Sequence, residues 1–234
     1  MTESSYLSSV RASYDAVAVD YARLVGPDLA GKPLDRAMLA AFAECVRGDG
    51  GGGGRAVADL GCGPGRVTAH LDGLGVRTFG VDLSPAMVAV ARRTYPGLRF
   101  EVGSMAALDV ADGVLGGVLA WYSTVHTPPS ELPVVFAEFA RVLAPGGHLL
   151  IAFKAGDERI RLDHAYGHPV DLDVYRTPPD LIAGLLAGAG LAEVARLVRE
   201  PDALEKSPQG FLLARKDQAV PFGSPDRRSM PVVD

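Results

Sequence analysis

The sequence predicts one α/β domain built on a doubly wound, mostly parallel β-sheet. From Arg55 onward, short apolar runs alternate with helical patterns, which is typical of parallel strands joined by helical crossovers. A length of 234 residues and a hydrophobic content of 48% are sufficient for a single sizeable core. A glycine-rich turn also follows the first apolar run directly, which is where ligands bind in sheets of this class.

The chain ahead of the sheet is predicted to be helical. A second helix, over 34–47, is expected after the turn-like segments Gly26-Pro27 and Gly31-Lys32-Pro33. The glycine run within 48–54 is low in complexity and is expected to be a flexible surface connection. The first helix is expected over 6–25, because apolar side chains recur there at steps of three and four: Tyr6, Val10, Tyr14, Val17, Tyr21 and Leu24 or Val25.

Seven strands with intervening helices are expected along the rest of the chain. Ser84-Pro85 and Thr127-Pro128 are typical of a helix N-cap followed by a first-turn proline. Thr177-Pro178-Pro179-Asp180 adds an acid at the third helical position, while Gly146-Gly147 and residues 188–190 are placed to end helices. The expected strands cover about 56–60, 77–81, 98–102, 115–121, 147–153, 191–199 and 209–215.

Two segments depart from this alternation. Residues 156–176 are rich in charge and histidine, and we expect them to be an insertion over the top of the sheet. Residues 217–234 contain three prolines, an Arg-Arg pair and no periodicity, and are expected to be a mobile tail.

Composition excludes several classes of partner. The formal net charge of −5 and the pI near 5.5 disfavour nucleic acid and anionic lipid as partners of the whole molecule. No run of about 18 apolar residues occurs, and the first ten residues lack a signal-peptide pattern, so a cytoplasmic protein without a membrane span is expected. Cys45 and Cys62 stand in different contexts and suggest neither a disulfide framework nor a metal knuckle.

The glycine turn DLGCGPGR, residues 59–66, indicates the kind of ligand. Glycines at 61, 63 and 65 allow a tight turn and let a ligand lie against bare backbone. A dinucleotide fingerprint would require a glycine where this chain has Arg66, and a pyrophosphate would be poorly served by the neighbouring acid Asp59. A ligand with a cationic centre suits Asp59 better.

A second motif, FGVDLS over residues 79–84, indicates a nucleoside. A short expected strand ends there in Asp82, about 20 residues after the glycine turn, where a carboxylate can accept hydrogen bonds from both ribose hydroxyls. The two motifs together therefore predict a ligand with a nucleoside and a cation.

These motifs, in this order, resemble those of the class I S-adenosylmethionine-dependent methyltransferases, and most closely the small-molecule branch with an N-terminal helical lid. The resemblance runs from Tyr14 to about Lys216. It implies a Rossmann-like sheet of about seven strands with an antiparallel last strand, in a single domain over 1–216 with a lid over 1–47 and a core over 55–216. Its carriers here are Asp59-Leu-Gly-Cys-Gly-Pro-Gly65, Gly80-Val-Asp-Leu-Ser84, Gly103-Ser-Met105, Leu119-Ala-Trp-Tyr-Ser123 and Arg141-Val-Leu-Ala-Pro-Gly-Gly-His-Leu-Leu150.

The resemblance also implies site residues for S-adenosyl-L-methionine and its product S-adenosyl-L-homocysteine. Many members carry an acid where this chain has Ser104, so recognition of the base here is expected to rest more on backbone and packing. The implied contacts are Asp59, Gly61, Gly63 and Gly65 for the methionine portion, Asp82 for the ribose, Leu83 and Met87 for the adenine face, Ser104 and Met105 for the adenine edge, Trp121 and Tyr122 for the methionine end, and Tyr14 and Tyr21 for the lid.

His126, just beyond the fourth expected strand, is the candidate general base or substrate-orienting group, and packing within its loop is the alternative. Asp163, His164 and His168 could suggest a metal site, but Gly167 and Pro169 argue against a continuous helix there, and no metal is expected. Cys62 is read as packing in the turn, because no sequence feature supplies an adjacent base.

The predicted function is transfer of a methyl group to an oxygen, nitrogen or carbon of a small molecule, with natural products as one candidate class. The alternatives are a non-catalytic protein that binds the same cofactor and a nicotinamide-dependent oxidoreductase, which lacks support at Arg66 and has no Tyr-x-x-x-Lys run. A nucleic-acid methyltransferase is disfavoured, because Trp121-Tyr122-Ser123 stands where an Asn/Asp-Pro-Pro-aromatic run is expected.

Overall fold

A seven-stranded sheet forms the centre of the molecule. The computed structural model describes residues 5–25, 28–48 and 54–218. The strand order is β3-β2-β1-β4-β5-β9-β8; β3, β2, β1, β4 and β5 are parallel, and β9 is antiparallel to both of its neighbours. The predicted doubly wound sheet with an antiparallel last strand is confirmed. Its strands are β1 (Val57–Leu60), β2 (Thr78–Asp82), β3 (Arg99–Val102), β4 (Leu115–Trp121), β5 (Leu143–Lys154), β8 (Leu191–Arg199) and β9 (Gln209–Lys216).

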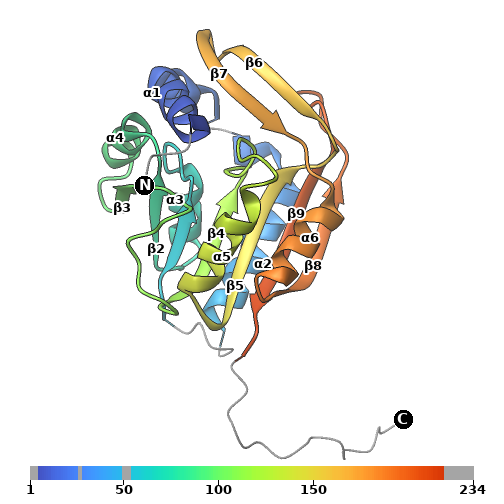
Figure 1. Cartoon of the computed structure of the whole chain (residues 1–234). Coiled ribbons are helices and arrows are strands. Elements are labelled where there is room, and N and C mark those ends of the chain that lie inside the picture. The colour runs from blue at the N-terminus through green and yellow to red at the C-terminus, as the bar shows by residue number, and fades with distance from the viewer. Residues whose placement is uncertain (1–4, 26–27, 49–53, 219–234) are drawn as a thin grey trace, which may run out of the picture.

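Helices cover both faces of the sheet, with α5 and α6 in front and α2 behind in Figure 1. Successive residues of β5 show the two-sided burial: Leu149 and Ile151 belong to the core cluster under α5 and α6, while Leu150 and Ala152 belong to the cluster under α2 and α3. The helical segments are α1 (Ser5–Val25), the 3-10 turn η1 (Asp28–Gly31), α2 (Pro33–Arg47), α3 (Arg66–Gly73), α4 (Pro85–Thr94), α5 (Leu132–Val142) and α6 (Pro179–Gly188).

Ser84 caps α4 as predicted, because its Oγ accepts a hydrogen bond from the backbone N–H of Met87. The prediction for Thr127-Pro128 is wrong. The backbone N–H of Thr127 donates to the carbonyl of Thr124 in a separate turn, and α5 begins only at Leu132 with Pro133 in its first turn. The segment 122–131 is therefore a loop, and it lies at the carboxyl end of β4.

Two further helix boundaries differ from the prediction. Gly146-Gly147 does not end a helix: α5 ends at Val142, and β5 begins at Leu143, which pairs with Leu115 ahead of a register shift. The glycines belong to this irregular part of the strand, where Gly146 has φ +78°. At α6 the cap is Pro178 instead of Thr177, so Asp180 stands at the second helical position.

The insertion is a β-hairpin, whose strands the sequence analysis did not predict. β6 (Arg159–Ala165) and β7 (His168–Tyr175) are antiparallel and are joined at Tyr166 and Gly167, both with positive φ as a two-residue hairpin turn requires. The hairpin packs on α1 beyond the carboxyl ends of the strands (Figure 1). Ser13 Oγ accepts from the backbone N–H of Asp171 at 3.0 Å. The predicted flexible glycine run at 49–53 and the tail from 219 onward lie outside the described residues.

A buried ion network ties α2 to β8 and to the 200–206 loop. Arg199 donates to Asp35 Oδ1 at 2.9 Å and to both carboxylate oxygens of Glu205, and Lys32 Nζ lies 2.7 Å from Glu205 Oε1. Burial raises the pKa of Glu205, but hydrogen bonds from Arg199 and Lys32 outweigh this and lower it to about 2. The network therefore holds Glu205 ionised at neutral pH, while burial raises the pKa of Asp35 and the hydrogen bond from Arg199 partly offsets this.

Arg199→Met is expected to destabilise the fold by about 3 to 5 kcal/mol, because the side chain of Asp35 is only 2% exposed and would lose its charge partner. Arg196→Met is the matched control on the same strand. Arg196 bridges Glu193 and the exposed Asp180, so its loss should leave the free energy of unfolding nearly unchanged. Denaturant unfolding measures both; equal losses in the two variants would contradict this account of Arg199.

Candidate functional site

The carboxyl ends of β1, β2 and β4 meet at the point where the strand order reverses. The chain runs from β1 outward to β3 and then returns to β4 on the other side of β1, which leaves a crevice above β1 and β4. The glycine turn follows β1, Asp82 ends β2, and Trp121 ends β4. Tyr122 comes next with φ +55°, a left-handed conformation that turns the chain sharply into the Ser123 loop.

Glycine is required at two positions of the turn, for different steric reasons. A Cβ on Gly61, which has φ +70°, would lie 2.3 Å from Ser123 Cβ, so only glycine lets β1 and the loop after β4 approach so closely. A Cβ on Gly65, which has φ +84°, would lie 2.7 Å from the ring of Phe100. Gly65 therefore serves packing between the turn and β3.

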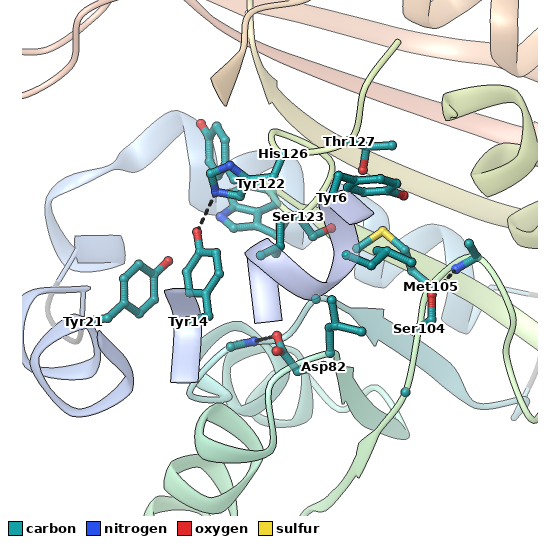
Figure 2. Close-up of a pocket in the computed structure, with 18 residues that line it drawn as sticks. Tyr6, Tyr14, Tyr21, Asp82, Ser104, Met105, Tyr122, Ser123, His126 and Thr127 are labelled. Atoms are coloured by element: carbon teal, nitrogen blue, oxygen red, sulfur yellow. Dashed lines mark hydrogen bonds between the residues drawn. The ribbon is translucent and has the colours of Figure 1, made fainter. Parts of the chain in front are cut away.

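Asp82 organises the turn as well as facing the cavity. Its Oδ2 accepts from the backbone N–H of Gly63 at 2.8 Å (Figure 2). Its Oδ1 accepts from the backbone N–H of Ser84 at 2.8 Å. Burial raises the pKa of Asp82, which these two hydrogen bonds partly offset. Each oxygen keeps lone-pair capacity for a further donor.

Asp59, a residue of β1, is buried and does not face the cavity. It is 1% exposed, and its Oδ2 accepts from Thr68 Oγ1 at 2.6 Å. Within the described residues its Oδ1 has no hydrogen-bond partner. Burial raises the pKa of Asp59 to about 7. A cationic group of a ligand near Asp59 would favour the ionised form of this carboxyl group.

The crevice contains a first cavity of about 100 Å³ beneath α1. Most of the predicted site residues line it, and Figure 2 shows Asp82 on one side with His126, Tyr14 and Tyr122 across from it. Asp59, Gly65 and Met87 are not among the lining residues. The predicted residues that line it are Tyr14, Tyr21, Gly61, Gly63, Asp82, Leu83, Ser104, Met105, Trp121, Tyr122 and His126.

Met87 lies under α1 instead, in a small apolar cluster with Val17, Ala18 and Val90. Asp15 reinforces this contact, because its Oδ1 accepts from Ser84 Oγ at 2.5 Å and from a backbone N–H in the first turn of α4. Helix α1 therefore packs against α4, which flanks the sheet, and against β7 of the hairpin.

His126 is held with a defined protonation pattern. Its Nδ1 lies 2.6 Å from the carbonyl oxygen of Asp173, which can only accept, so Nδ1 carries the proton. Burial lowers the pKa of His126 to about 4, and the neutral ring then presents an unprotonated Nε2. Tyr14 donates its hydroxyl hydrogen to this Nε2 at 2.9 Å (Figure 2). The ring is therefore neutral at pH 7, and the lone pair of Nε2 faces a hydrogen-bond donor.

A second cavity of about 420 Å³ adjoins the first, between the sheet, α1 and the hairpin. Tyr14, Tyr21, Trp121, Tyr122 and His126 line both cavities. The apolar side chains of the hairpin form one wall: Ile160, Leu162, Leu172 and Val174. This volume lies within the range of small-molecule sites.

The histidine and aspartate residues considered for a metal do not converge. His168 Nε2 lies 2.9 Å from Asp20 Oδ2 on α1, while His164 lies 3.4 Å from Asp163. In the part of the chain that the structure describes, no three His, Cys, Asp or Glu side chains are grouped as metal ligands would be. Across the same ranges, no helix combines the length and apolar character needed to cross a membrane.

Several lining residues were not predicted. Tyr6 and Val10 extend the apolar stripe of α1 into the first cavity, and continuation of the Tyr14–Tyr21 spacing could have indicated them. Ser123 and Thr127 come from the loop that was partly assigned to a helix. Lys154 and Arg176 line the second cavity without a local sequence signal that distinguishes them from surface cations.

Comparisons with known proteins show that this chain is similar to methyltransferases. Residues 57–147 match the family described as "Methyltransferase domain". A malonyl-[acyl-carrier protein] O-methyltransferase of Erwinia billingiae is 30% identical over 119 residues, which are 51% of this chain and 46% of that protein. A trans-aconitate 2-methyltransferase of Methylobacterium nodulans is 38% identical over 100 residues, 41% of this chain and 36% of that protein. The matches therefore span less than half the length of these curated relatives.

Solved structures share the fold over nearly the whole chain. Magnesium protoporphyrin IX methyltransferase from Synechocystis PCC 6803, with bound S-adenosylmethionine, superposes with a TM-score of 0.70 at 16% identity, over 93% of this chain and all of that one. The 1,6-didemethyltoxoflavin-N1-methyltransferase of Burkholderia thailandensis, with its substrate and S-adenosylhomocysteine bound, gives 0.68 at 20% identity, over 93% of each chain. The predicted fold is thus confirmed at the level of the whole architecture.

Proposed function

We propose that this chain is a class I S-adenosylmethionine-dependent methyltransferase that transfers a methyl group to an oxygen, nitrogen or carbon atom of a small molecule. The match of residues 57–147 to the methyltransferase domain family and the fold shared with solved methyltransferases support this proposal. One observation carries the proposal: the bare glycine turn and Asp82 meet at the reversal of strand order, beneath α1 and opposite His126. When bound there, S-adenosylmethionine supplies an activated methyl group on a sulfonium centre.

The residues present fit this cofactor. Asp82 has remaining acceptor capacity for ribose hydroxyls, and Gly61 and Gly63 offer backbone without side chains next to it. Asp59 has an oxygen without a partner among the described residues, and a cationic ligand nearby would satisfy it electrostatically. Leu83 and Met105 line the same cavity as Asp82 and would supply apolar contact for a base.

The chain's contribution to the reaction is positioning, exclusion of water and control of one proton. Correct alignment of two reactants can supply about 7 to 11 kcal/mol of the barrier reduction. His126 Nε2 accepts the proton of an acceptor hydroxyl or amine, and the carbonyl of Asp173 stabilises the ring while it is charged. Tyr14 occupies the Nε2 position until an acceptor replaces it.

Turnover against a panel of small hydroxylated, amino and carbon-acid acceptors tests the proposal, with formation of S-adenosylhomocysteine as the readout. The acidic net charge makes small molecules a better choice for the panel than nucleic acid. Acceptor-dependent product supports the proposed activity. Tight cofactor binding without turnover on any acceptor would instead favour the non-catalytic binding protein.

Removal of residues 1–25 is expected to weaken binding of S-adenosylhomocysteine and abolish turnover while leaving the sheet folded. Tyr14 and Tyr21 would be lost from both cavities, whereas neither of the two main core clusters contains a residue of α1. Calorimetric titration measures the affinity, and thermal unfolding reports on the sheet. Unchanged cofactor affinity in the truncated protein would count against a lid role for α1.

A further inference from the structure

We propose that the second cavity selects an acceptor that carries an anionic group, a carboxylate or a phosphate, and that Lys154 and Arg176 bind this group. The inference rests on the proposed function and deepens it, because it names the chemical class of the acceptor. It is carried by the charges that line the cavity, where Lys and Arg side chains outnumber carboxylates among the described residues.

Lys154 ends β5 at the wall of the second cavity. Among the described residues, no side chain or backbone group forms a hydrogen bond or ion pair with its ammonium group. Burial lowers the pKa of Lys154 and the neighbouring Arg176 lowers it further, while the charge of Glu205 partly offsets both effects. A half-buried cation held beside another cation is costly unless an anion joins them.

Arg176 follows β7 and lines the same cavity. Its backbone N–H donates to the carbonyl of Glu158 at 2.8 Å, and its Nη1 donates to the carboxylate of that residue at 2.6 Å, so the guanidinium is held in place. Its Nε is buried and has no acceptor among the described residues. The guanidinium is therefore fixed in place at the cavity wall, and one of its donors, at a buried position, is not matched by an acceptor in the described part of the chain.

The rest of the lining does not neutralise these two residues. Among the described residues that line the cavity there are five Lys and Arg side chains and one carboxylate, Glu205. Glu205 is already bound by both Arg199 and Lys32. The chain as a whole carries a formal charge of −5, so this local excess of positive charge runs against the overall balance and would draw an anionic ligand into the cavity.

Lys154 also acts on His126. Apart from burial, the positive charge of Lys154 is one of the influences that lower the pKa of His126. A bound anion would offset this charge and favour the imidazolium that forms when Nε2 accepts a proton. The anionic group would thus place the acceptor beside His126 and raise the basicity of that residue in the same step.

Calorimetric titration of the full chain, saturated with S-adenosylhomocysteine, tests the proposal with three aromatic probes of similar size: 4-hydroxybenzoate, phenyl phosphate and neutral 4-hydroxybenzamide. We expect at least one anion to bind about tenfold or more tightly than the amide, as a hydrogen bond to a charged group implies. The two anions separate a carboxylate site from a phosphate site.

Lys154→Met should reduce this preference to about threefold or less, with the affinity for S-adenosylhomocysteine unchanged. Arg93→Met removes the same charge from the exposed face of α4 and should keep the preference. If Lys154→Met fails to fold, Lys154→Gln and Arg176→Gln take its place. Equal binding of anion and amide, no binding of either anion, or a preference that survives these changes would overturn the proposal.

Failure of the proposed function gives a different result. Absence of S-adenosylhomocysteine binding contradicts the cofactor assignment, while the same probes titrated without it still measure whether the cavity prefers anions. Because the two readouts are separate, one can fail without the other.

Discussion

His126→Asn is expected to lower kcat by about 10²- to 10⁴-fold on an acceptor whose reacting group is protonated at neutral pH. The asparagine amide can still donate to the carbonyl of Asp173 in place of Nδ1, so the loop keeps its anchor, but no basic nitrogen remains at the Nε2 position. Steady-state turnover together with cofactor affinity measures the effect. Wild-type turnover across pH 6 to 9 would end the assignment, because a general base should then be dispensable.

His126→Gln separates the two roles of the residue. Its amide can reach the Nε2 position and accept from Tyr14, but it cannot take up a proton. If His126 only orients the acceptor, the glutamine variant should recover much of the activity that asparagine loses. If it is a base, both variants should be similarly slow.

The same residue predicts a pH dependence. The pKa of His126 is lowered from 6.5 to about 4 in the folded chain, so kcat/KM should stay level between about pH 6 and 8 and fall only on the acid side. For stability, the unfolded chain binds the His126 proton first, between pH 6.5 and about 4. His126 therefore contributes to loss of stability as the pH falls through this window, and His126→Asn should lack that contribution.

Asp82→Ala is expected to weaken binding of S-adenosylhomocysteine by about 10²- to 10⁴-fold. Two hydrogen bonds from ribose hydroxyls to a carboxylate are worth about 1.5 to 3 kcal/mol each. The backbone N–H groups of Gly63 and Ser84 would also lose their acceptor, which loosens the turn that faces the ligand. Calorimetric titration measures the affinity.

Asp72→Ala is the matched control for Asp82→Ala. Asp72 is exposed near the end of α3, and its replacement removes the same charge. Thermal unfolding of both variants shows whether the fold survives. An affinity for S-adenosylhomocysteine within about threefold of wild type in folded Asp82→Ala would reject the ribose assignment.

The central strands were predictable because their signal is local. Most residues of β1, β4 and β5 are buried on both faces of the sheet, so these strands are mostly apolar in sequence. The start of β5 was not predictable, because Gly146-Gly147 has the local pattern of a helix end, whereas pairing of Leu143 with Leu115 on β4 extends the strand backward. Pairing between strands is a tertiary effect that overrides the local pattern.

The alternating pattern of a strand was present in the sequence of the hairpin, but the charged residues of this segment obscured it. Ile160 and Leu162 alternate with Arg159 and Arg161, which is the period of a half-buried strand. The apolar members of this alternation line the second cavity.

The sequence motifs of the site were predictable, but the degree of burial of the individual residues was not. Sequence spacing placed Asp59 and Asp82 at neighbouring strand ends, yet only the packed structure separates Asp82, which lines the cavity, from Asp59, which is buried below it. The contact between Tyr14 and His126 joins residues 112 positions apart. No local pattern encodes such a contact, because it depends on how α1 packs across the sheet.

Calorimetric titration of the wild-type chain with S-adenosylhomocysteine, beside an identical titration with NAD, tests whether the crevice is a site for S-adenosylmethionine. We expect saturable binding of S-adenosylhomocysteine and none of NAD, because Asp82 and the glycine turn suit a nucleoside with a cationic centre and Arg66 replaces the last glycine of a dinucleotide fingerprint. Binding of NAD, or binding of neither compound to protein shown to be free of retained ligand, would contradict this assignment.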